Sequence, residues 1–186
     1  MTITTIAVLG AGQMGNGIAQ VAAIAGYNVV MVDLEQEYVD RGIATIHKSL
    51  GRLVAKEKIS QEDADLALAR INTATERSAC ADADLVVEAI PEIPEIKFSA
   101  FQDLDDICKP SAILATNTSS ISIDAIAEKT SRPEKVIGMH FMNPVPVMKL
   151  VEVINGSDTS NEVTEAVLSA AEKMGKIPLM CNDSPG

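Results

Sequence analysis

Two ionisable side chains, His140 and Glu152, lie near opposite ends of the segment GMHFMNPVPVMKLVEV, residues 138–153. The chain contains only two histidines, so this placement is informative. A histidine can take up and release a proton near neutral pH. A carboxylate beside it can fix its tautomer and stabilise its charged form, as in the histidine–aspartate half of a hydrolase triad. The pair therefore has the chemistry of a general base and its orienting partner.

The two apolar runs that carry this pair are KVIGMHF (135–141) and MKLVEVI (148–154), and too few residues separate them for a helix. Neighbouring parallel strands need a crossover of about a dozen residues or more, so we expect these runs to be antiparallel or sharply bent. A hairpin centred on Pro146 leaves His140 and Glu152 equidistant from its centre. We therefore predict that the two side chains face each other.

A glycine pattern of the form GxGxxG, with Gly10, Gly12 and Gly15, follows the apolar run TTIAVLG (4–10) and opens the helical pattern MGNGIAQVAAIAG (14–26). Alone the pattern is weak, but a preceding strand and a following helix are the context it requires. Gly10 permits a tight turn, Gly12 lets the backbone approach a pyrophosphate, and Gly15 lets helix and strand pack closely. The loop therefore predicts a dinucleotide-binding βαβ unit.

The second strand of that unit, YNVVMVD (27–33), ends in Asp33, 23 residues after Gly10. An acid at this position can accept hydrogen bonds from the adenosine ribose and repels a 2′-phosphate. The following residues, LEQE, supply no arginine or lysine for such a phosphate. These features favour NAD over NADP, although a glycine turn with a solvated Asp33 is the structural alternative.

The segment TNTSS (116–120) follows an inner apolar run, AILATN (112–117). Ligands of open α/β sheets bind beyond the C-terminal ends of the strands, so Ser119 could hydrogen-bond a substrate oxygen. A dehydrogenase acting on an alcohol also needs a base for the hydroxyl proton, which His140 could supply. Each residue has a structural alternative: a hydrogen-bonded strand-end histidine, a solvent-facing Glu152, and serines that cap the next helix.

Strand-like and helix-like segments alternate along the chain, which predicts an α/β fold with a mostly parallel sheet covered on both faces. With the glycine loop and the hairpin, we expect a Rossmann-type doubly wound sheet with an added antiparallel strand pair. The remaining predicted strands are INTAT (71–75), DLVVEAI (84–90) and IPLMC (177–181), and the remaining predicted helices span 35–59, 60–71 with Ser60 as N-cap, 94–109, 122–130 with Ser122 as cap, and 160–175.

The composition excludes several classes of protein. A formal net charge of −11 over 186 residues argues against binding to nucleic acid or to a membrane surface. The cysteines, Cys80, Cys108 and Cys181, are scattered and odd in number, so we expect neither disulfides nor a metal site. No signal peptide and no apolar stretch long enough to cross a bilayer is evident. We therefore expect a cytoplasmic location.

Five motifs together resemble the short-chain 3-hydroxyacyl-CoA dehydrogenase family, and its bacterial 3-hydroxybutyryl-CoA dehydrogenases most closely. They are GAGQMGNGIAQ, DLVVEAIPE, LATNTSS, GMHFMNPVPVMKLVEV and the terminal DSPG, and the resemblance runs over nearly the whole chain. It implies NAD(H)-dependent interconversion of a (3S)-3-hydroxyacyl-CoA, with 3-hydroxybutyryl-CoA as the expected substrate, and its 3-ketoacyl-CoA. That reaction belongs to fatty-acid and butyrate metabolism.

The resemblance also implies roles for individual residues. His140 falls on the family's catalytic histidine, Glu152 on its partner, and Ser119 on a serine that contacts substrate. Coenzyme A contacts fall on Ser49 and Lys56. The latter belongs to a helical stripe with Lys48 and Arg52, which could receive phosphates or could be an ordinary solvated basic face. The cofactor-binding positions fall on Gly10, Gly12, Gln13, Met14, Gly15, Asp33, Glu92, Lys97, Asn117, Ser119 and Asn143.

The family continues beyond DSPG with a Phe-x-x-Asn-Arg segment and an all-helical domain, whereas this sequence ends at Gly186. In the family, that domain forms most of a homodimer and one wall of the active site. We therefore expect residues 1–186 to be one NAD-binding domain at the boundary to the helical domain. We also expect it to bind NADH and to turn over acyl-CoA poorly by itself.

Two alternatives from other functional classes stay open. One is a non-catalytic NAD-binding or structural protein of the same descent, since lens crystallins related to this family show that the scaffold can serve a structural role. The presence of both His140 and Glu152 favours enzymatic descent. The other is a β-hydroxyacid dehydrogenase of a different family with the same glycine loop. Those enzymes use a catalytic lysine on a later helix, and no lysine here stands out in that role.

Overall fold

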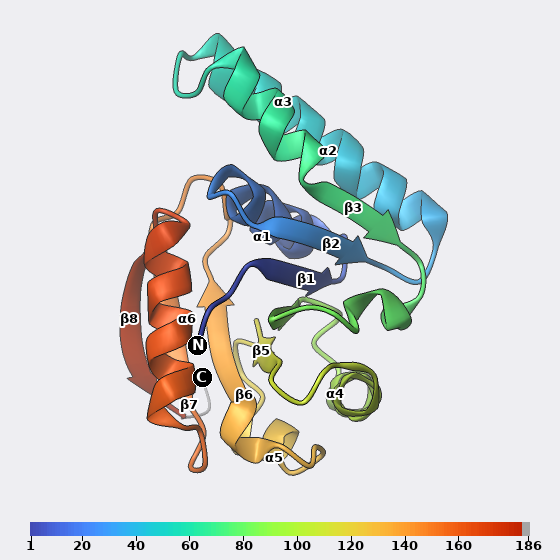
Figure 1. Ribbon diagram of the computed structural model, residues 1–186, viewed down its shortest axis with the longest axis vertical. Coiled ribbons are helices and arrows are strands. Elements are labelled where there is room, and N and C mark those ends of the chain that lie inside the picture. The colour runs from blue at the N-terminus through green and yellow to red at the C-terminus, as the bar shows by residue number, and fades with distance from the viewer. Residues whose placement is uncertain (184–186) are drawn as a thin grey trace.

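The computed structural model describes residues 1–183, which form an eight-stranded sheet flanked by helices (Figure 1). The last three residues of the DSPG motif lie outside the described residues. The strands are β1 (Thr5–Leu9), β2 (Asn28–Val32), β3 (Ile71–Ala74), β4 (Leu85–Glu88), β5 (Ile113–Thr116), β6 (Val136–Phe141), β7 (Leu150–Asn155) and β8 (Ile177–Asn182).

The predicted helices are present. Ser60, Ser122 and Ser160 cap three of them through their hydroxyl groups, because each hydroxyl accepts a bond from a backbone N–H in the first turn. The helices are α1 (Gln13–Ile24), α2 (Gln36–Ala55), α3 (Gln61–Ala69), α4 (Pro94–Ile107), α5 (Ile123–Ala127) and α6 (Asn161–Lys173), with the 3₁₀ helices η1 (Arg77–Cys80) and η2 (Pro133–Lys135).

The strand order is β3-β2-β1-β4-β5-β6-β7-β8. Every pairing is parallel except that of β6 with β7, which confirms the predicted mostly parallel sheet with one antiparallel pair. The chain leaves β1 to form β2 on one side and returns later to form β4 on the other. A crevice for a ligand is expected at this reversal of strand order, and the glycine loop begins there.

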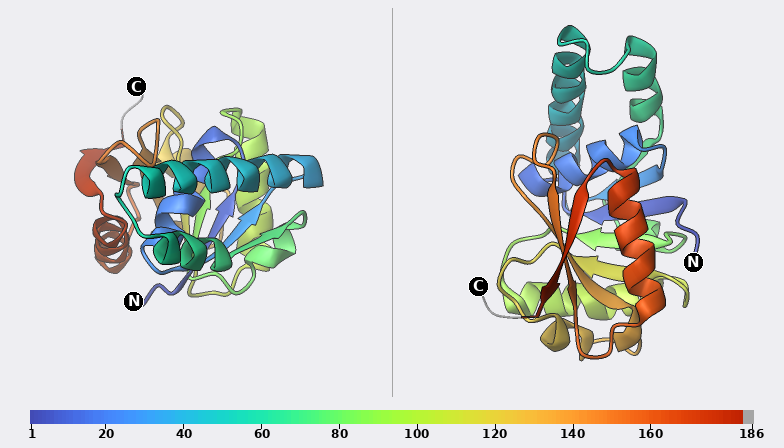
Figure 2. Two further views of the ribbon diagram at one scale, coloured as in Figure 1. Left: turned by 90° about the horizontal axis from the view of Figure 1, so that it is seen from above. Right: turned by 90° about the vertical axis from the view of Figure 1, so that its left-hand side faces the viewer.

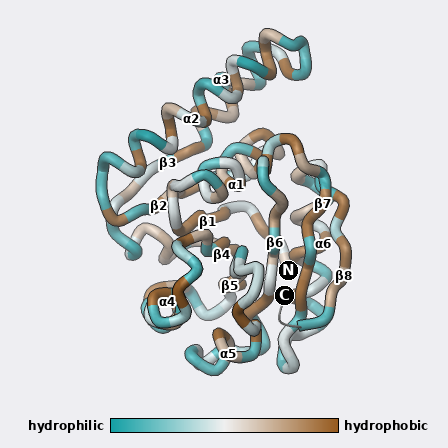
Figure 3. Tube along the Cα trace, turned by 180° about the vertical axis from the view of Figure 1, so that it is seen from behind, coloured by the Kyte–Doolittle hydropathy of each residue, from teal (hydrophilic) through white to brown (hydrophobic). Residues whose placement is uncertain are grey.

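Helices cover the two faces of the sheet unequally (Figure 1). On one face α1, α2, α3 and α6 enclose a core that includes Ile18, Ile46 and Val167. On the other face α4 and α5 enclose a second core around Phe101 and Ile126. Figure 3 shows the hydrophobic stretches along the strands between these layers. Figure 2 shows α2 and α3 projecting from the body of the fold as a helical pair.

The antiparallel pair has the predicted register, because His140 pairs with Glu152 and the ladder is therefore symmetric about Pro146. The loop between the two strands is tied to the body of the fold by Lys176, whose ammonium donates to the carbonyl oxygens of Val145 and of Met148, the latter at 2.8 Å. Burial and, to a smaller extent, the charge of nearby Lys149 together lower the pKa of Lys176 to about 8.

One predicted helix was inaccurate, and the two 3₁₀ helices were not predicted. The predicted helix 122–130 is only the five-residue α5, because Thr130 turns its hydroxyl back onto Ala127 and Ser131 bonds instead to Asp105. The short helix η1 was not predicted, since four residues carry too little periodicity to detect.

Within residues 1–183, no helix combines the length and the hydropathy that crossing a bilayer would require. The three cysteines are free thiols. Burial raises the pKa of Cys80 to about 12 and that of Cys108 to about 11, so both remain protonated and unreactive at neutral pH. Across the described part of the chain, no group of three or more histidine, cysteine or acidic side chains could hold a metal ion.

Candidate functional site

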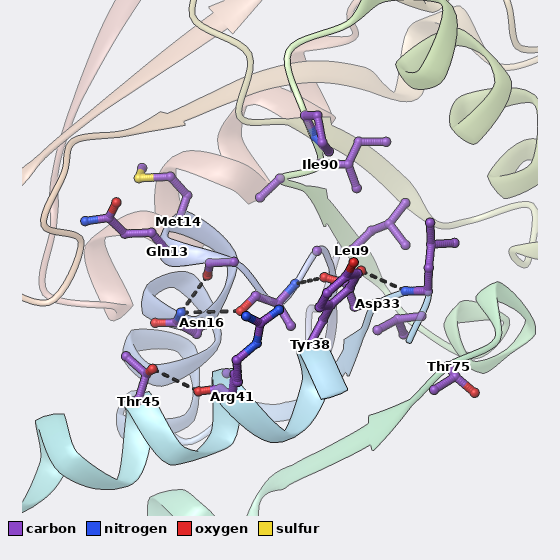
Figure 4. Close-up of a pocket in the computed structure, with 18 of the residues that line it drawn as sticks. Leu9, Gln13, Met14, Asn16, Asp33, Tyr38, Arg41, Thr45, Thr75 and Ile90 are labelled. Carbon is purple, nitrogen blue, oxygen red and sulfur yellow. Dashed lines mark hydrogen bonds between the residues drawn. The ribbon is translucent and has the colours of Figure 1, made fainter. Parts of the chain in front are cut away.

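A cleft of about 900 Å³ lies beyond the C-terminal ends of β1 and β2 (Figure 4). The glycine loop forms one side of it, and the start of α2 and the residues after β4 form the others. Among the predicted cofactor-binding residues, those that line this cleft are Gly10, Gly12, Gln13, Met14 and Asp33.

The three glycines serve different purposes in this loop. Gly10 has φ +108°, and a Cβ there would lie 2.5 Å from the carbonyl oxygen of Ala89. A Cβ on Gly15 would lie 1.8 Å from the carbonyl oxygen of Gly10, so the start of α1 packs directly on the turn. Gly12, in contrast, has nothing within 4 Å of such a Cβ. Its open side, at the N-terminus of α1 where no side chain caps the helix, fits a pyrophosphate.

Asp33 ties the glycine loop to the end of β2. One carboxylate oxygen accepts a hydrogen bond from the backbone N–H of Ala11 at 2.7 Å, and the other accepts one from Leu34 at 2.7 Å. A carboxylate can accept about four hydrogen bonds, so acceptor sites remain for ribose hydroxyls. The residue that would select the ribose therefore also holds the loop that would receive the pyrophosphate.

Sequence reasoning missed several residues of the cleft, notably Tyr38 and Arg41 of α2 and Arg77 of η1. The Arg41 guanidinium lies over the Tyr38 ring, 5.0 Å from its centroid, and points into the cleft (Figure 4). Spacing along α2 could have identified Tyr38 and Arg41, because positions three residues apart share a helix face. Arg77 gave no such signal, since it reaches the cleft only through the pairing of β3 with β2.

His140 and Glu152 form the predicted pair, with His140 Nδ1 2.8 Å from Glu152 Oε2. An ionised carboxylate can only accept, so Nδ1 carries the shared proton and Nε2 is left as the acceptor. The two side chains are 21% and 33% exposed, so a ligand can reach them. The arrangement is that of a histidine base held in one tautomer by its partner.

A second cluster lies at the C-terminal ends of β4 and β5. The ammonium of Lys97, which is 1% exposed, lies 2.6 Å from Glu88 Oε1 and 3.1 Å from Glu92 Oε2, and it donates to the carbonyl oxygen of Ile90 at 3.2 Å. Thr116 donates its hydroxyl to Glu88 Oε2 at 2.7 Å. Sequence reasoning included Lys97 and Glu92 but missed Glu88, although a charged residue in the apolar strand LVVE signals a buried partner.

Glu92 in turn holds the turn that carries Ser119. One of its oxygens accepts from the Thr118 hydroxyl and from the backbone N–H groups of Ser119 at 3.1 Å and Ser120 at 3.3 Å. Burial raises the pKa of Glu92, but the Thr118 hydroxyl and the Lys97 charge outweigh it and lower the pKa overall. Glu92 is therefore an anion at neutral pH.

The two asparagines and Ser119 lie along the same edge of the sheet. Asn117 follows β5 and accepts at 2.8 Å from the backbone N–H of Phe141, next to His140. Asn143 follows β6 and accepts at 3.2 Å from the Gln13 side chain of the glycine loop. Ser119 is exposed at the end of β5, beside β6. The edge thus runs from the glycine loop to the His140–Glu152 pair.

Ser49 and Lys56 do not join these residues. Both belong to the end of α2 that projects from the fold, and neither lines the cleft (Figure 2). Lys48, Arg52 and Lys56 are exposed and take part in no ion pair among residues 1–183. The structure therefore leaves this stripe as a positively charged helix surface available to solvent.

The chain is similar in sequence to known dehydrogenases. A family model described as 3-hydroxyacyl-CoA dehydrogenase, NAD binding domain, matches residues 5–184. A relative from Deinococcus radiodurans named probable 3-hydroxybutyryl-CoA dehydrogenase is 55% identical over 179 residues, covering 96% of this chain and 64% of the relative. An Escherichia coli relative named 3-hydroxyadipyl-CoA dehydrogenase is 44% identical over 186 residues, covering 100% of this chain and 39% of the relative.

The crystal structure of (S)-3-hydroxybutyryl-CoA dehydrogenase from Ralstonia eutropha matches with a TM-score of 0.97 and 46% identity, covering 100% of this chain and 65% of that one. The chain thus spans less than two thirds of the length of these relatives. Over the matched region, this chain has the same fold as the Ralstonia eutropha structure.

Proposed function

The chain belongs to the NAD-binding domain family of 3-hydroxyacyl-CoA dehydrogenases, and from this premise we propose that it supplies the cofactor site and the catalytic base for NAD-dependent interconversion of (3S)-3-hydroxyacyl-CoA and 3-ketoacyl-CoA. The observation that carries the proposal is the 2.8 Å contact between His140 and Glu152 at the same sheet edge as the glycine loop. A non-catalytic NAD-binding protein would have no need of an oriented base.

The proposed roles follow from the geometry. NAD held by the glycine loop and Asp33 would supply the acceptor for the hydride of C3 of the hydroxyacyl group. In that direction His140 Nε2 takes the proton of the 3-hydroxyl group, and Glu152 stabilises the resulting imidazolium through Nδ1. Ser119, exposed at the end of β5, hydrogen-bonds the same substrate oxygen. In the reverse direction the imidazolium returns the proton as the ketone is reduced.

The cofactor positions divide along the sheet edge. Asp33 and the glycine loop fit the adenosine and pyrophosphate parts, because they surround the cleft beyond β1 and β2. Glu92, Lys97, Asn117 and Asn143 follow β4, β5 and β6, on the side of His140. We propose that this second group lies around the nicotinamide half.

The names of the relatives and a basic surface on α2 support a coenzyme A thioester as the substrate. The relatives are named for 3-hydroxybutyryl-CoA and 3-hydroxyadipyl-CoA, which share the 3-hydroxyacyl-CoA group. The basic surface of Lys48, Arg52 and Lys56, with Ser49 beside it, suits the phosphates of coenzyme A. We expect replacement of Lys56 by alanine to raise KM for the acyl-CoA without changing NADH affinity.

The longer relatives also suggest how the site is completed. Ile177 and Leu179 of β8 are 65% and 53% exposed, and Leu179 pairs with Glu152. We propose that a helical domain covers this apolar strand in the complete protein and forms a homodimer, with residues 1–186 as the NAD-binding domain. Three free thiols and a net charge of −11 suit a cytoplasmic protein without nucleic-acid partners.

The test is loss of NADH absorbance on addition of acetoacetyl-CoA, with His140→Ala as the control. Turnover that disappears in His140→Ala supports the dehydrogenase proposal. NADH binding without turnover, both in this chain and in one extended through the helical domain, would instead indicate a non-catalytic NAD-binding protein. We expect turnover to be poor in residues 1–186 alone and to rise in the extended chain, because the helical domain forms part of the site.

A further inference from the structure

Glu88 is the last residue of β4, and its side chain is 0% exposed. A buried carboxylate is costly unless its charge and its lone pairs are matched. Here Oε1 accepts from the Lys97 ammonium at 2.6 Å and from the backbone N–H of Ile90 at 2.7 Å, and Oε2 accepts from the Thr116 hydroxyl at 2.7 Å. Glu88 thereby joins the paired ends of β4 and β5 to Lys97 of α4.

Lys97 links the buried Glu88 to Glu92, which is partly exposed to solvent. An ammonium has three donors, and the three acceptors around Lys97 Nζ are Glu88, the carbonyl oxygen of Ile90 and Glu92. Glu88 and the Ile90 carbonyl oxygen are held by the end of β4 and the residues directly after it. The third, Glu92, is 38% exposed and sits on the segment between β4 and α4, so its carboxylate is held where Lys97 points.

Glu92 completes the connection to the active-site edge, because it binds the backbone N–H groups of Ser119 and Ser120 and the hydroxyl of Thr118. We propose that Glu88 is a positioning residue: its buried carboxylate fixes Lys97 and, through Lys97, orients Glu92 and the turn carrying Ser119 at the nicotinamide end of the site. This inference rests on the proposed function, since it gives Glu88 a part in holding that site.

The competing explanation is that Glu88 serves stability alone. Buried ion pairs are often no better for stability than apolar side chains of the same size, so burial by itself does not decide between the two. The location of the partners favours positioning. Lys97, Ile90 and Thr116 all lie at the C-terminal edge of the sheet, where the predicted cofactor residues gather.

The test is a double-mutant cycle on NADH affinity, read from nicotinamide fluorescence at a temperature where every variant is folded. Glu88→Gln keeps the size of the side chain and one acceptor but removes the charge that holds Lys97. We expect it to weaken NADH binding about tenfold, which corresponds to the loss of one hydrogen bond to a charged group. Glu92→Gln should weaken binding by a similar factor, and the double variant should be within about twofold of the weaker single variant.

A matched control separates positioning from stability. Asp105→Asn removes a carboxylate that holds Arg132 at 2.6 Å near the other end of α4. It should lower the melting temperature as Glu88→Gln does, yet leave NADH affinity unchanged. If Glu88→Gln does not fold, Glu88→Asp keeps the charge but draws the carboxylate back from Lys97, and it should weaken NADH binding about threefold.

Three results would overturn the proposal. The first is NADH affinity within twofold of wild type in folded Glu88→Gln or, failing that, in Glu88→Asp. The second is a loss of NADH affinity in the double variant equal to the product of the two single losses. That result would show that Glu88 and Glu92 act independently. The third is an unchanged affinity in Glu92→Gln, which would leave the network nothing to position. Failure of the wild-type protein to bind NADH would instead contradict the proposed function itself.

Discussion

His140 and Glu152 face each other across the antiparallel strands β6 and β7, with Nδ1 and Oε2 2.8 Å apart. The pairing of the two strands brings the side chains to the same face, because directly opposed residues of antiparallel strands share a face. Lys176 holds the intervening loop from the start of β8. The proposed base and its partner are thus positioned by the sheet rather than by a flexible loop.

Glu152→Gln should lower kcat by about 10- to 100-fold while leaving NADH affinity within twofold of wild type. The amide of glutamine can no longer stabilise an imidazolium at Nδ1, and its NH₂ group can hold the histidine in the other tautomer. Steady-state kinetics with acetoacetyl-CoA over a range of pH measure the effect. An unchanged kcat and pH profile would show that Glu152 has no part in the proton transfer.

Asp33→Ser should raise affinity for NADPH about tenfold and weaken that for NADH. The negative charge that repels a 2′-phosphate is gone in this variant. Arg41 and Arg77 already line the same cleft, although Arg77 is paired with Asp103. Fluorescence titration with each cofactor measures the change.

The gain in NADPH affinity should depend on those arginines. Adding Arg41→Gln and Arg77→Gln to Asp33→Ser should abolish it, because no cation would then remain at this end of the cleft to pair with the phosphate. A gain that survives in the triple variant would show that Asp33 excludes NADPH without any contribution from them.

Gly12→Ala and Gly15→Ala should fail in different ways. A methyl group on Gly15 would lie 1.8 Å from the Gly10 carbonyl oxygen, so the loop must shift and the melting temperature should fall sharply. A methyl group on Gly12 meets nothing, so that variant should fold normally but lose NADH affinity, because its Cβ fills the space for the pyrophosphate. Thermal melts and NADH titrations of both variants test this, and full NADH affinity in Gly12→Ala would contradict it.

Asp84 should make the fold sensitive to acid. It lies before β4, away from the site, and accepts from Lys109 at 2.6 Å and from the backbone N–H groups of Thr4 and Thr5. Burial raises its pKa, but these donors outweigh burial and hold the pKa well below the usual range. A depressed carboxyl pKa stabilises the fold above about pH 4 and loses that contribution as the pH falls further.

Asp84→Asn should therefore cost about 1–3 kcal/mol at pH 7, and the difference from wild type should shrink below about pH 4. Urea unfolding at pH 7 and pH 3 provides the measurement. NADH affinity at pH 7 should stay unchanged, which distinguishes this residue from those of the site. A difference that is equal at both pH values would show that the Asp84 charge is not its source.

Local patterns in the sequence determined much of this structure. The glycine loop, the strand ending in Asp33, the alternation of strands and helices, and the His140–Glu152 opposition all depend on short spacings. Such features follow from side-chain period and turn length, so they can be recognised before the strand order is known. Even the location of Ser119 at a strand end followed from the apolar run before it.

Only the tertiary structure decided which strand ends are neighbours. Glu88 reaches Thr116 because β4 pairs with β5, and Arg77 reaches the cleft of Asp33 because β3 pairs with β2. These contacts join residues far apart in the chain, and no local period encodes them. Long-range strand pairing therefore joined Glu88 and Glu92 to the end of β5, and it brought Arg77 to the cleft, because these contacts form only when several elements pack together.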